Sequence, residues 1–212
     1  TAPVAARNLS WATIERVVRN SGQPYWLTRF AFLRALGLVY LIAFFSLSRQ
    51  CSALLGSSGL LPARLYLDSL AAAPGLGSSR FLLVPTLFWL NCSDAALLAL
   101  AWIGVLLALA AVAGATNAPL YLALWILYTS FVNVGQVFYG YGWEMMLLEA
   151  GFLAVFLCPL KSWRPFPAGS PPPEIVLFLL RWMLVRVMFG AGLIKLRGDP
   201  CWRDLSCLLF HY

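Results

Sequence analysis

The sequence predicts an all-α fold, a polytopic transmembrane helical bundle of about five spans. The first reason is composition, because 61% of the residues are hydrophobic and 11% are charged, whereas soluble domains have roughly 45–50% apolar and about 25% charged residues. The second reason is a mean hydropathy of +0.80 over 212 residues, which leaves too few polar side chains to cover a water-soluble globule. The third is a series of apolar stretches near the ~20 residues that a helix needs to cross a bilayer.

The predicted organisation starts with a polar arm and continues as one membrane domain. Residues 1–24 carry Arg7, Arg16 and Arg19 and no continuous apolar core, so we expect them to lie outside the membrane on the cytosolic side. Residues 25–212 are expected to form a multi-span membrane domain. Because the chain opens at Thr1 rather than Met, we expect it to be a fragment of a longer protein.

Five apolar stretches within residues 25–212 are interpreted as spans. The first is long enough at 1.5 Å per residue to cross a hydrocarbon core of about 30 Å. The longest connection, 48–94, contains a short amphipathic stretch at 62–70 and an apolar stretch at 81–90 that includes Pro85. This last stretch is too short for a span and is expected to be interfacial or re-entrant. The expected spans are residues 26–47, 95–114, 119–139, 145–160 and 174–196.

The distribution of cations predicts the orientation. Arg16, Arg19 and Arg29 flank the first span, and Lys161 and Arg164 lie between the fourth and fifth spans. Cytosolic connections carry an excess of Lys and Arg, so both clusters are expected on the cytosolic side. Five crossings then place loop 48–94 and tail 197–212 on the opposite, lumenal side. The cations follow the ends of apolar stretches and form no basic stripe, so no nucleic-acid partner is expected.

The lumenal side contains candidates for covalent modification. Cys201 and Cys207 bracket a short polar loop, and a disulfide is expected there because a non-cytosolic compartment is oxidising, with two free thiols as the alternative. Cys51 and Cys92 are a second possible pair, and Cys158 is expected to pack within the membrane. Of two glycosylation sequons, at Asn8 and Asn91, the second is the candidate, although it lies close to the next helix.

Charged residues within apolar helices require an explanation, because each costs about 2.5–3.5 kcal/mol at a helix centre. We expect intramembrane ion pairs, with Arg181 or Arg186 paired to Glu144 or Glu149. The ion-pair candidates are Arg34, Glu144, Glu149, Arg181 and Arg186.

Three further polar side chains are singled out by their position in an apolar stretch. Asn133 and Gln136 form a polar face that is expected to contact a neighbouring helix. Lys195 has two interpretations: a catalytic base or anion site, favoured by desolvation, or a side chain that snorkels to water from the end of its span. No Cys/His cluster accompanies the single histidine, His211, so no metal and no cofactor are expected.

Four strings of the sequence resemble the lipase maturation factor family, particularly its type-one branch. The resemblance runs from about residue 24 to residue 212, which is the amino-terminal membrane portion of such proteins. The strings are PYWLTRF at 24–30, LLGSSGLLP at 54–62, VNVGQ with GWEMMLLEAGFL at 132–136 and 142–153, and GAGLIKLRGDPCWRDLSC at 190–207.

This resemblance implies a multi-pass protein of the endoplasmic reticulum membrane. Its partners would be membrane lipid and secreted dimeric lipases such as lipoprotein lipase, which it would help to fold, assemble and leave that compartment. It would be a chaperone-like maturation factor without a reaction of its own, and client contacts are expected on the loops around 54–70 and 197–212.

An enzymatic alternative comes from a second, more distant resemblance. The stretch Gly192 to Leu196 resembles the part of the vitamin K-dependent carboxylase membrane domain that carries a catalytic lysine. This implies a membrane-embedded enzyme with Lys195 as base.

Overall fold

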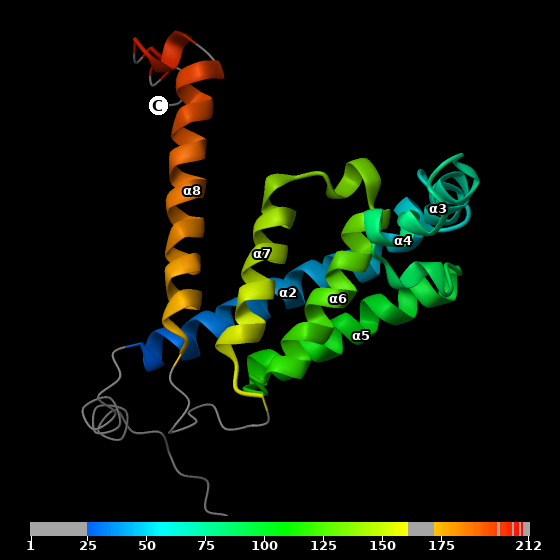
Figure 1. The fold of residues 1–212 in the computed structure, drawn as a ribbon, viewed down its shortest axis with the longest axis horizontal. Coiled ribbons are helices and arrows are strands. Elements are labelled where there is room, and N and C mark those ends of the chain that lie inside the picture. Colours follow the sequence, from blue (N-terminus) through cyan, green and yellow to red (C-terminus); the bar gives the residue numbers. More distant parts are fainter. Residues whose placement is uncertain (1–24, 161–171, 199, 205, 208, 210–212) are drawn as a thin grey trace, which may run out of the picture. The chain divides into compact units, whose positions relative to one another are not determined.

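The computed structural model describes residues 25–160, 172–198, 200–204, 206–207 and 209. Every regular element among them is a helix, and no strand occurs in these parts of the chain, which confirms the all-α prediction (Figure 1). The chain divides into two units, Thr1–Pro172 and Pro173–Tyr212, and each is described by itself. The expected arm 1–24 and the cations Lys161 and Arg164 lie outside the described residues.

The first unit is built on four apolar helices with recognisable start and stop signals. Ser93 Oγ accepts from Ala96 N at 3.2 Å at the start of the second helix, and Asn117 Oδ1 accepts from Leu120 N at 2.9 Å at the start of the third. The second helix ends at Gly114, which has a φ of 117° that favours glycine. The four helices are α2 (Trp26–Leu55), α5 (Asp94–Ala113), α6 (Ala118–Val134) and α7 (Gly142–Leu157).

Short elements fill the connections between these helices. The amphipathic stretch expected at 62–70 is the helix α3 (Ala63–Ala72). The apolar stretch 81–90 is broken into α4 (Arg80–Leu83) and the 3-10 turn η2 (Leu87–Trp89), as expected from Pro85 between them. Two further 3-10 turns are η1 (Gly77–Ser79) and η3 (Gln136–Tyr139).

Two helix ends differ from the sequence prediction. α2 was expected to stop at residue 47 but continues to Leu55, because Cys51 and Leu55 are buried and extend its packing surface. The span expected at 119–139 ends as an α-helix at Val134, since Gly135 begins a tighter 3-10 turn.

Helix length separates the expected spans into two groups. Leu27–Leu55, Asp94–Ala113 and, in the second unit, Glu174–Gly198 are long and apolar enough to cross a membrane. α6 has 17 residues and α7 has 16, which at 1.5 Å per residue is about 24–26 Å and less than a typical hydrocarbon core.

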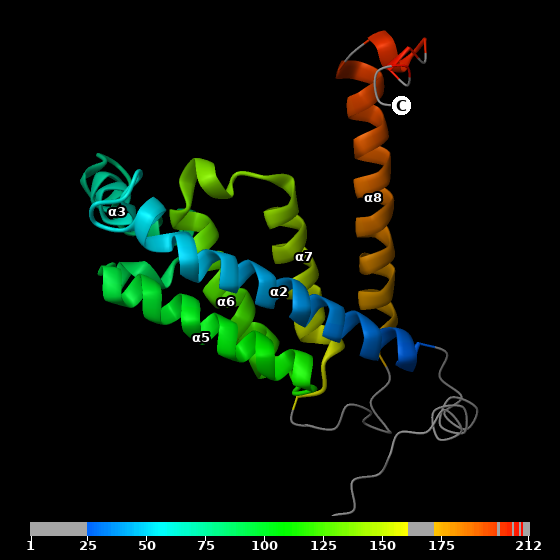
Figure 2. The ribbon, with the colours of Figure 1, turned by 180° about the vertical axis from the view of Figure 1, so that it is seen from behind.

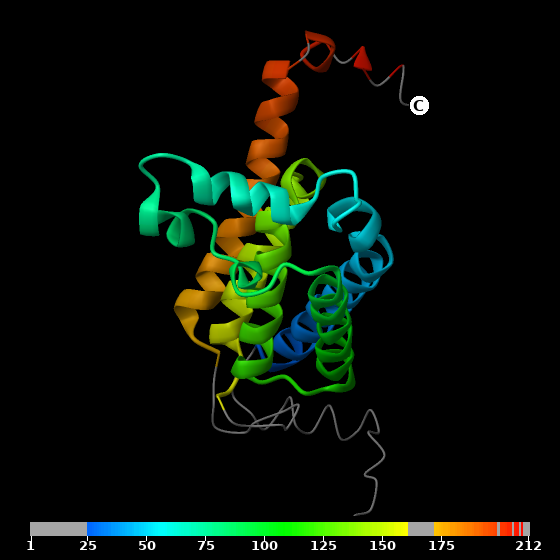
Figure 3. The same ribbon diagram turned by 90° about the vertical axis from the view of Figure 1, so that its right-hand side faces the viewer.

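The four helices of the first unit run alternately up and down (Figures 1 and 2). At one end, Ala118 N donates to Pro159 O at 3.1 Å, which joins the start of α6 to the end of α7. At the other end, α2 ends next to the start of α5, and residues 56–93 and 135–141 lie there. We call this the loop end. Figure 3 shows α3 crosswise to the helices of the bundle.

Aromatic side chains and two glycines form the centre of the first unit. The rings of Tyr40 and Phe44 on α2 meet the Tyr128 ring of α6 edge-on, with centroids 5.7 and 5.6 Å apart. Gly104 on α5 lies against the Phe44 ring, and Gly151 on α7 lies against the Tyr40 hydroxyl. Because these glycines have no side chain, α5 and α7 can approach α2 closely.

The second unit contains the long helix α8 (Glu174–Gly198) and the 3-10 turn η4 (Pro200–Trp202). A disulfide joins Cys201 to Cys207. Arg203 Nε donates to Leu196 O at 2.9 Å, so the residues after α8 fold back and satisfy a carbonyl at its end.

The contact of Gly104 with Phe44 predicts the effect of adding one methyl group. Gly104→Ala places a Cβ within 2.5 Å of three atoms of the Phe44 ring. We expect this overpacking to lower the free energy of unfolding by about 1–3 kcal/mol, despite the better helix propensity of alanine. Thermal unfolding in detergent measures the change. Gly142→Ala is the control, because a Cβ at that position meets open space; equal midpoints for the two variants would contradict the packing described here.

Candidate functional site

The turn after α2 is held tightly to the helix from which it emerges. Gly56 N donates to Cys51 O at 3.1 Å, and the chain then reverses so that Leu60 N donates to Ala53 O at 3.0 Å and Leu61 N to Leu54 O at 2.9 Å. This reversal leaves the Leu60 side chain 73% exposed. An apolar side chain is therefore presented on a turn whose backbone is fixed by hydrogen bonds.

Asp94 ties this turn to the beginning of α5. Its carboxylate accepts from Ser57 N at 2.7 Å and from Ser57 Oγ at 2.6 Å. Hydrogen bonds to an ionised carboxylate are stronger than those between neutral groups. The ends of α2 and α5, which pack along much of their lengths, are thus locked together at the loop end.

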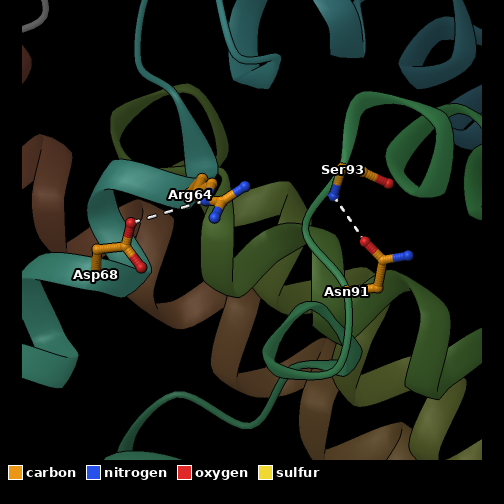
Figure 4. A network of polar contacts seen from close by, with 4 residues as sticks. All are labelled: Arg64, Asp68, Asn91 and Ser93. Atoms are coloured by element: carbon orange, nitrogen blue, oxygen red, sulfur yellow. Dashed lines mark hydrogen bonds and ion pairs between the residues drawn. The ribbon is translucent and has the colours of Figure 1, made fainter.

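α3 packs against the bundle on one face and presents side chains on the other. Ala63 and Leu67 are buried, and Leu65 on the opposite face is 65% exposed. Arg64 Nε and Asp68 Oδ2 lie 3.9 Å apart one turn along the helix, in an exposed pair (Figure 4). Such an exposed pair contributes at most about 1 kcal/mol to stability.

α6 fixes the segment that follows α4. Thr86 Oγ1 donates to Ser130 O at 3.1 Å, and Leu87 N donates to Ser130 Oγ at 3.1 Å. Asn133 Nδ2 donates to Pro85 O at 2.8 Å and Gln136 Nε2 to Leu61 O at 3.4 Å. The polar residues expected to contact a helix therefore have loop carbonyls as acceptors.

A pocket of about 290 Å³ lies between α3 and the chain that leads into α5. Asn91, the glycosylation candidate, is exposed at its edge, and its Oδ1 accepts from Ser93 N at 3.0 Å (Figure 4). This turn places Ser93 as the cap of α5. The pocket is lined by Arg64, Leu67, Asp68, Phe88, Trp89, Leu90, Asn91, Cys92 and Ser93.

Residues 56–93 thus form a surface with a defined backbone, which we call the platform. Large exposed apolar side chains gather on it, and exposed apolar patches of this kind mark protein or membrane contact. They are Leu60, Leu65, Phe81, Leu82, Leu83 and Leu90.

Two of the expected intramembrane charges have neutral partners. Glu144 is 1% exposed, and its carboxylate accepts a hydrogen bond from the Tyr128 hydroxyl. The Arg34 guanidinium lies 3.8 Å from the centroid of the Phe30 ring, and Arg34 Nε donates to Val112 O at 3.2 Å. The sequence analysis did not identify Tyr128, because nothing in an apolar stretch indicates which carboxylate a tyrosine hydroxyl will contact.

The remaining ion-pair candidates are placed on two helices. Glu149 is half-buried on α7, and Arg181 and Arg186 are exposed on α8 in the second unit. The pairing of either arginine with Glu144 or Glu149 stays a prediction.

Lys195 lies in the last turn of α8, close to the disulfide. It is exposed, and its Nζ is 4.7 Å from the centroid of the Trp202 ring. A cation above an aromatic face is an attractive contact. The contact with Trp202 accounts for the position of this side chain, and its catalytic role stays a prediction. The described residues contain no group of three or more potential metal ligands.

The second expected cysteine pair is not formed. Cys51 and Cys92 are free thiols, the first buried in α2 and the second partly buried beside the pocket. Cys158 is also free and is buried at the end of α7, as expected of a packing residue. The proposal of a Cys51–Cys92 bridge was wrong, because a cysteine buried in a helix face is held by packing.

An apolar helical bundle with three helices long enough to cross a bilayer defines an integral membrane protein. The protein-family model described as the lipase maturation factor transmembrane domain matches residues 27–212 of the chain. The chain therefore belongs to the lipase maturation factor family.

Named relatives support the same assignment. The chain is 46% identical to lipase maturation factor 1 of Bos taurus over 203 residues. This alignment covers 93% of this chain and 36% of the relative. It is 45% identical to the Homo sapiens protein of that name, over 89% of this chain and 34% of the relative. The chain is 37% identical to lipase maturation factor 2 of Gallus gallus, in an alignment that covers 90% of this chain and 28% of that relative. The chain thus spans about a third of these relatives, and no solved structure matches it.

The environment of Cys92 predicts low thiol reactivity. Burial raises the pKa of the Cys92 thiol above its ordinary value. The fraction of Cys92 present as thiolate near neutral pH is therefore smaller than that of a solvent-exposed cysteine. We expect alkylation of Cys92 by a maleimide to be several-fold slower than that of Ser58→Cys on the exposed turn, measured by peptide mass spectrometry. The difference should narrow as the pH is raised, and equal rates near pH 7 would show that Cys92 is not shielded.

Proposed function

We propose that this chain is the membrane portion of an endoplasmic-reticulum factor that helps secreted dimeric lipases, such as lipoprotein lipase, to fold, assemble and leave that compartment. Family membership and the names of the relatives support the proposal. The observation that carries it is the platform, an exposed apolar surface on a backbone fixed to the bundle by polar contacts from α5 and α6. A folding client exposes apolar surface that such a platform can hold.

The proposed orientation places the platform and the tail 197–212 in the lumen, with the arm 1–24 in the cytosol. Within the expected loop 48–94, residues 56–93 lie at the same end of the first unit as residues 135–141. One orientation would therefore expose the platform and residues 135–141 to the compartment in which secreted lipases fold. The disulfide between Cys201 and Cys207 fits an oxidising lumen.

The proposed mechanism is binding without a chemical step by this chain. Exposing apolar side chains costs little free energy while lipid or client partly covers them. Because the backbone that carries them is fixed in advance, the platform loses less conformational entropy when a client binds. Membrane lipid is the second partner, since the bundle requires it as solvent. We propose no cofactor and no metal for this role.

The platform leucines provide the direct test. In cells that lack the endogenous protein, the full-length protein with Leu60→Ala and Leu65→Ala is expected to restore several-fold less secreted lipase activity than the wild type, because two apolar contacts to the client are lost. Leu106→Ala is the matched control: Leu106 and Leu65 are 64% and 65% exposed, and Leu106 lies on α5, a helix long and apolar enough to cross a membrane. Equal activity of all proteins at equal abundance would reject client binding by the platform.

The enzymatic alternative makes an opposite prediction at Lys195. If the chain acts by binding, Lys195→Ala in the full-length protein leaves secreted lipase activity close to that of the wild type, because the side chain is exposed and contacts only Trp202 among described aromatic rings. A catalytic base would lose nearly all activity at unchanged protein abundance. Lys195→Arg separates charge from proton transfer, since arginine retains the charge and cannot act as a base at neutral pH.

A further inference from the structure

A second pocket, of about 410 Å³, lies between residues 81–90 and α6. Its surface is almost entirely apolar, and three aromatic side chains, Phe81, Trp89 and Trp125, contribute to it. The remaining lining residues are Pro85, Thr86, Leu87, Leu90, Ile126, Thr129 and Ser130. We call it the α6 pocket. It is distinct from the pocket beside Asn91, which lies on the α3 side.

The position of the α6 pocket restricts what can occupy it. One wall consists of Trp125, Ile126, Thr129 and Ser130, which belong to the apolar helix α6. Ile126 and Leu90 are exposed beside it, so the pocket opens to the surroundings of the protein. In a bundle that spans a bilayer, the surroundings at the depth of α6 would be hydrocarbon, so a lipid acyl chain could enter the pocket.

A single cation marks one edge of the α6 pocket. The Arg80 guanidinium lies 4.9 Å from the centroid of the Phe81 ring and 5.5 Å from that of Trp89, and both rings line the pocket. Arg80 Nη1 is 3.5 Å from Ala71 O, and its Nε is buried without a hydrogen-bond partner among the described residues. No carboxylate of the described chain pairs with this charge. The site therefore has unused capacity for an anion.

A hydroxyl group adds a polar contact within the apolar wall. Thr129 Oγ1 is buried and has no partner in the described part of the chain, whereas the neighbouring Ser130 hydroxyl bonds to Ile126 O and Leu87 N. A buried hydroxyl without a partner is costly in a membrane bundle. The ester oxygen of a lipid is an acceptor of the kind that Thr129 lacks.

We propose that the α6 pocket binds an anionic phospholipid of the surrounding bilayer, with an acyl chain against Trp125 and Ile126 and the phosphate at Arg80. The apolar slot and the cation at its edge match the two halves of such a lipid, and guanidinium groups bind phosphate well. The lipid would cover the exposed edge of the 81–90 segment and brace the platform. This inference rests on the membrane location and is independent of the lipase proposal.

The test measures lipid retention by the full-length protein in nanodiscs of phosphatidylglycerol and phosphatidylcholine in equal amounts, followed by native mass spectrometry. We expect the wild type to retain phosphatidylglycerol several-fold over phosphatidylcholine. Arg80→Gln should abolish this preference and Arg80→Lys should keep most of it. Arg49→Gln is the control, because Arg49 is an exposed cation on α2, well before the platform, and should leave the preference unchanged.

A second variant separates the acyl slot from the charge. Ile126→Trp fills the pocket and is expected to reduce retention of both lipids without changing helical content, measured by circular dichroism. An unchanged lipid ratio in Arg80→Gln, or an equal loss in Arg49→Gln, would overturn the proposal. Retention of added oleate with no preference between the two phospholipids would overturn it in favour of a fatty-acid site.

Discussion

The hydrocarbon core of a bilayer offers no hydrogen-bond partners, and this constraint accounts for the polar contacts within the bundle. The Tyr128 hydroxyl donates to Glu144, and the Trp125 indole donates to Leu148 O at 3.0 Å. Tyr121 on α6 likewise donates its hydroxyl to Leu33 O on α2. Each bond satisfies a group that would be costly in hydrocarbon, and each also joins α6 to a neighbour. These bonds join α6 to both α2 and α7.

The same helix determines the geometry of the platform. Ser130 and Asn133 lie near the end of α6 and bond to residues 85–87, while Gln136 just beyond it reaches Leu61. These bonds add to the buried side chains of Val84 and Phe88 in holding the 81–90 segment, whose other large apolar side chains include four that are exposed. The contacts allow an apolar surface to remain exposed without collapsing onto the bundle. A surface of this kind is useful for binding, whereas a flexible one would lose entropy each time it bound.

The helices could be predicted because hydrophobic length is a strong local signal. Residues 95–114 and 174–196 nearly coincide with α5 and α8, whose ends carry polar or glycine residues in the sequence. The end of α2 was missed because Ser48, Arg49 and Gln50 look like a boundary, while Cys51 and Leu55 beyond them are buried. Polar residues in the sequence can therefore mark the expected edge of a membrane span without ending the helix. α2 continues past them because its next buried side chains still pack against the bundle.

The polar pairs could not be predicted from the same signals, because they depend on which helices become neighbours. Glu144 was recognised as a buried charge that needs a partner, and an arginine was the reasonable choice on charge alone. The structure gives it Tyr128, sixteen positions away on the adjacent helix. A neutral donor satisfies the carboxylate without bringing a second charge into the membrane, and so avoids part of the desolvation cost of an ion pair. Among the described residues, Arg80 at the edge of the α6 pocket has two aromatic rings and no carboxylate beside it, so its charge can meet a lipid phosphate.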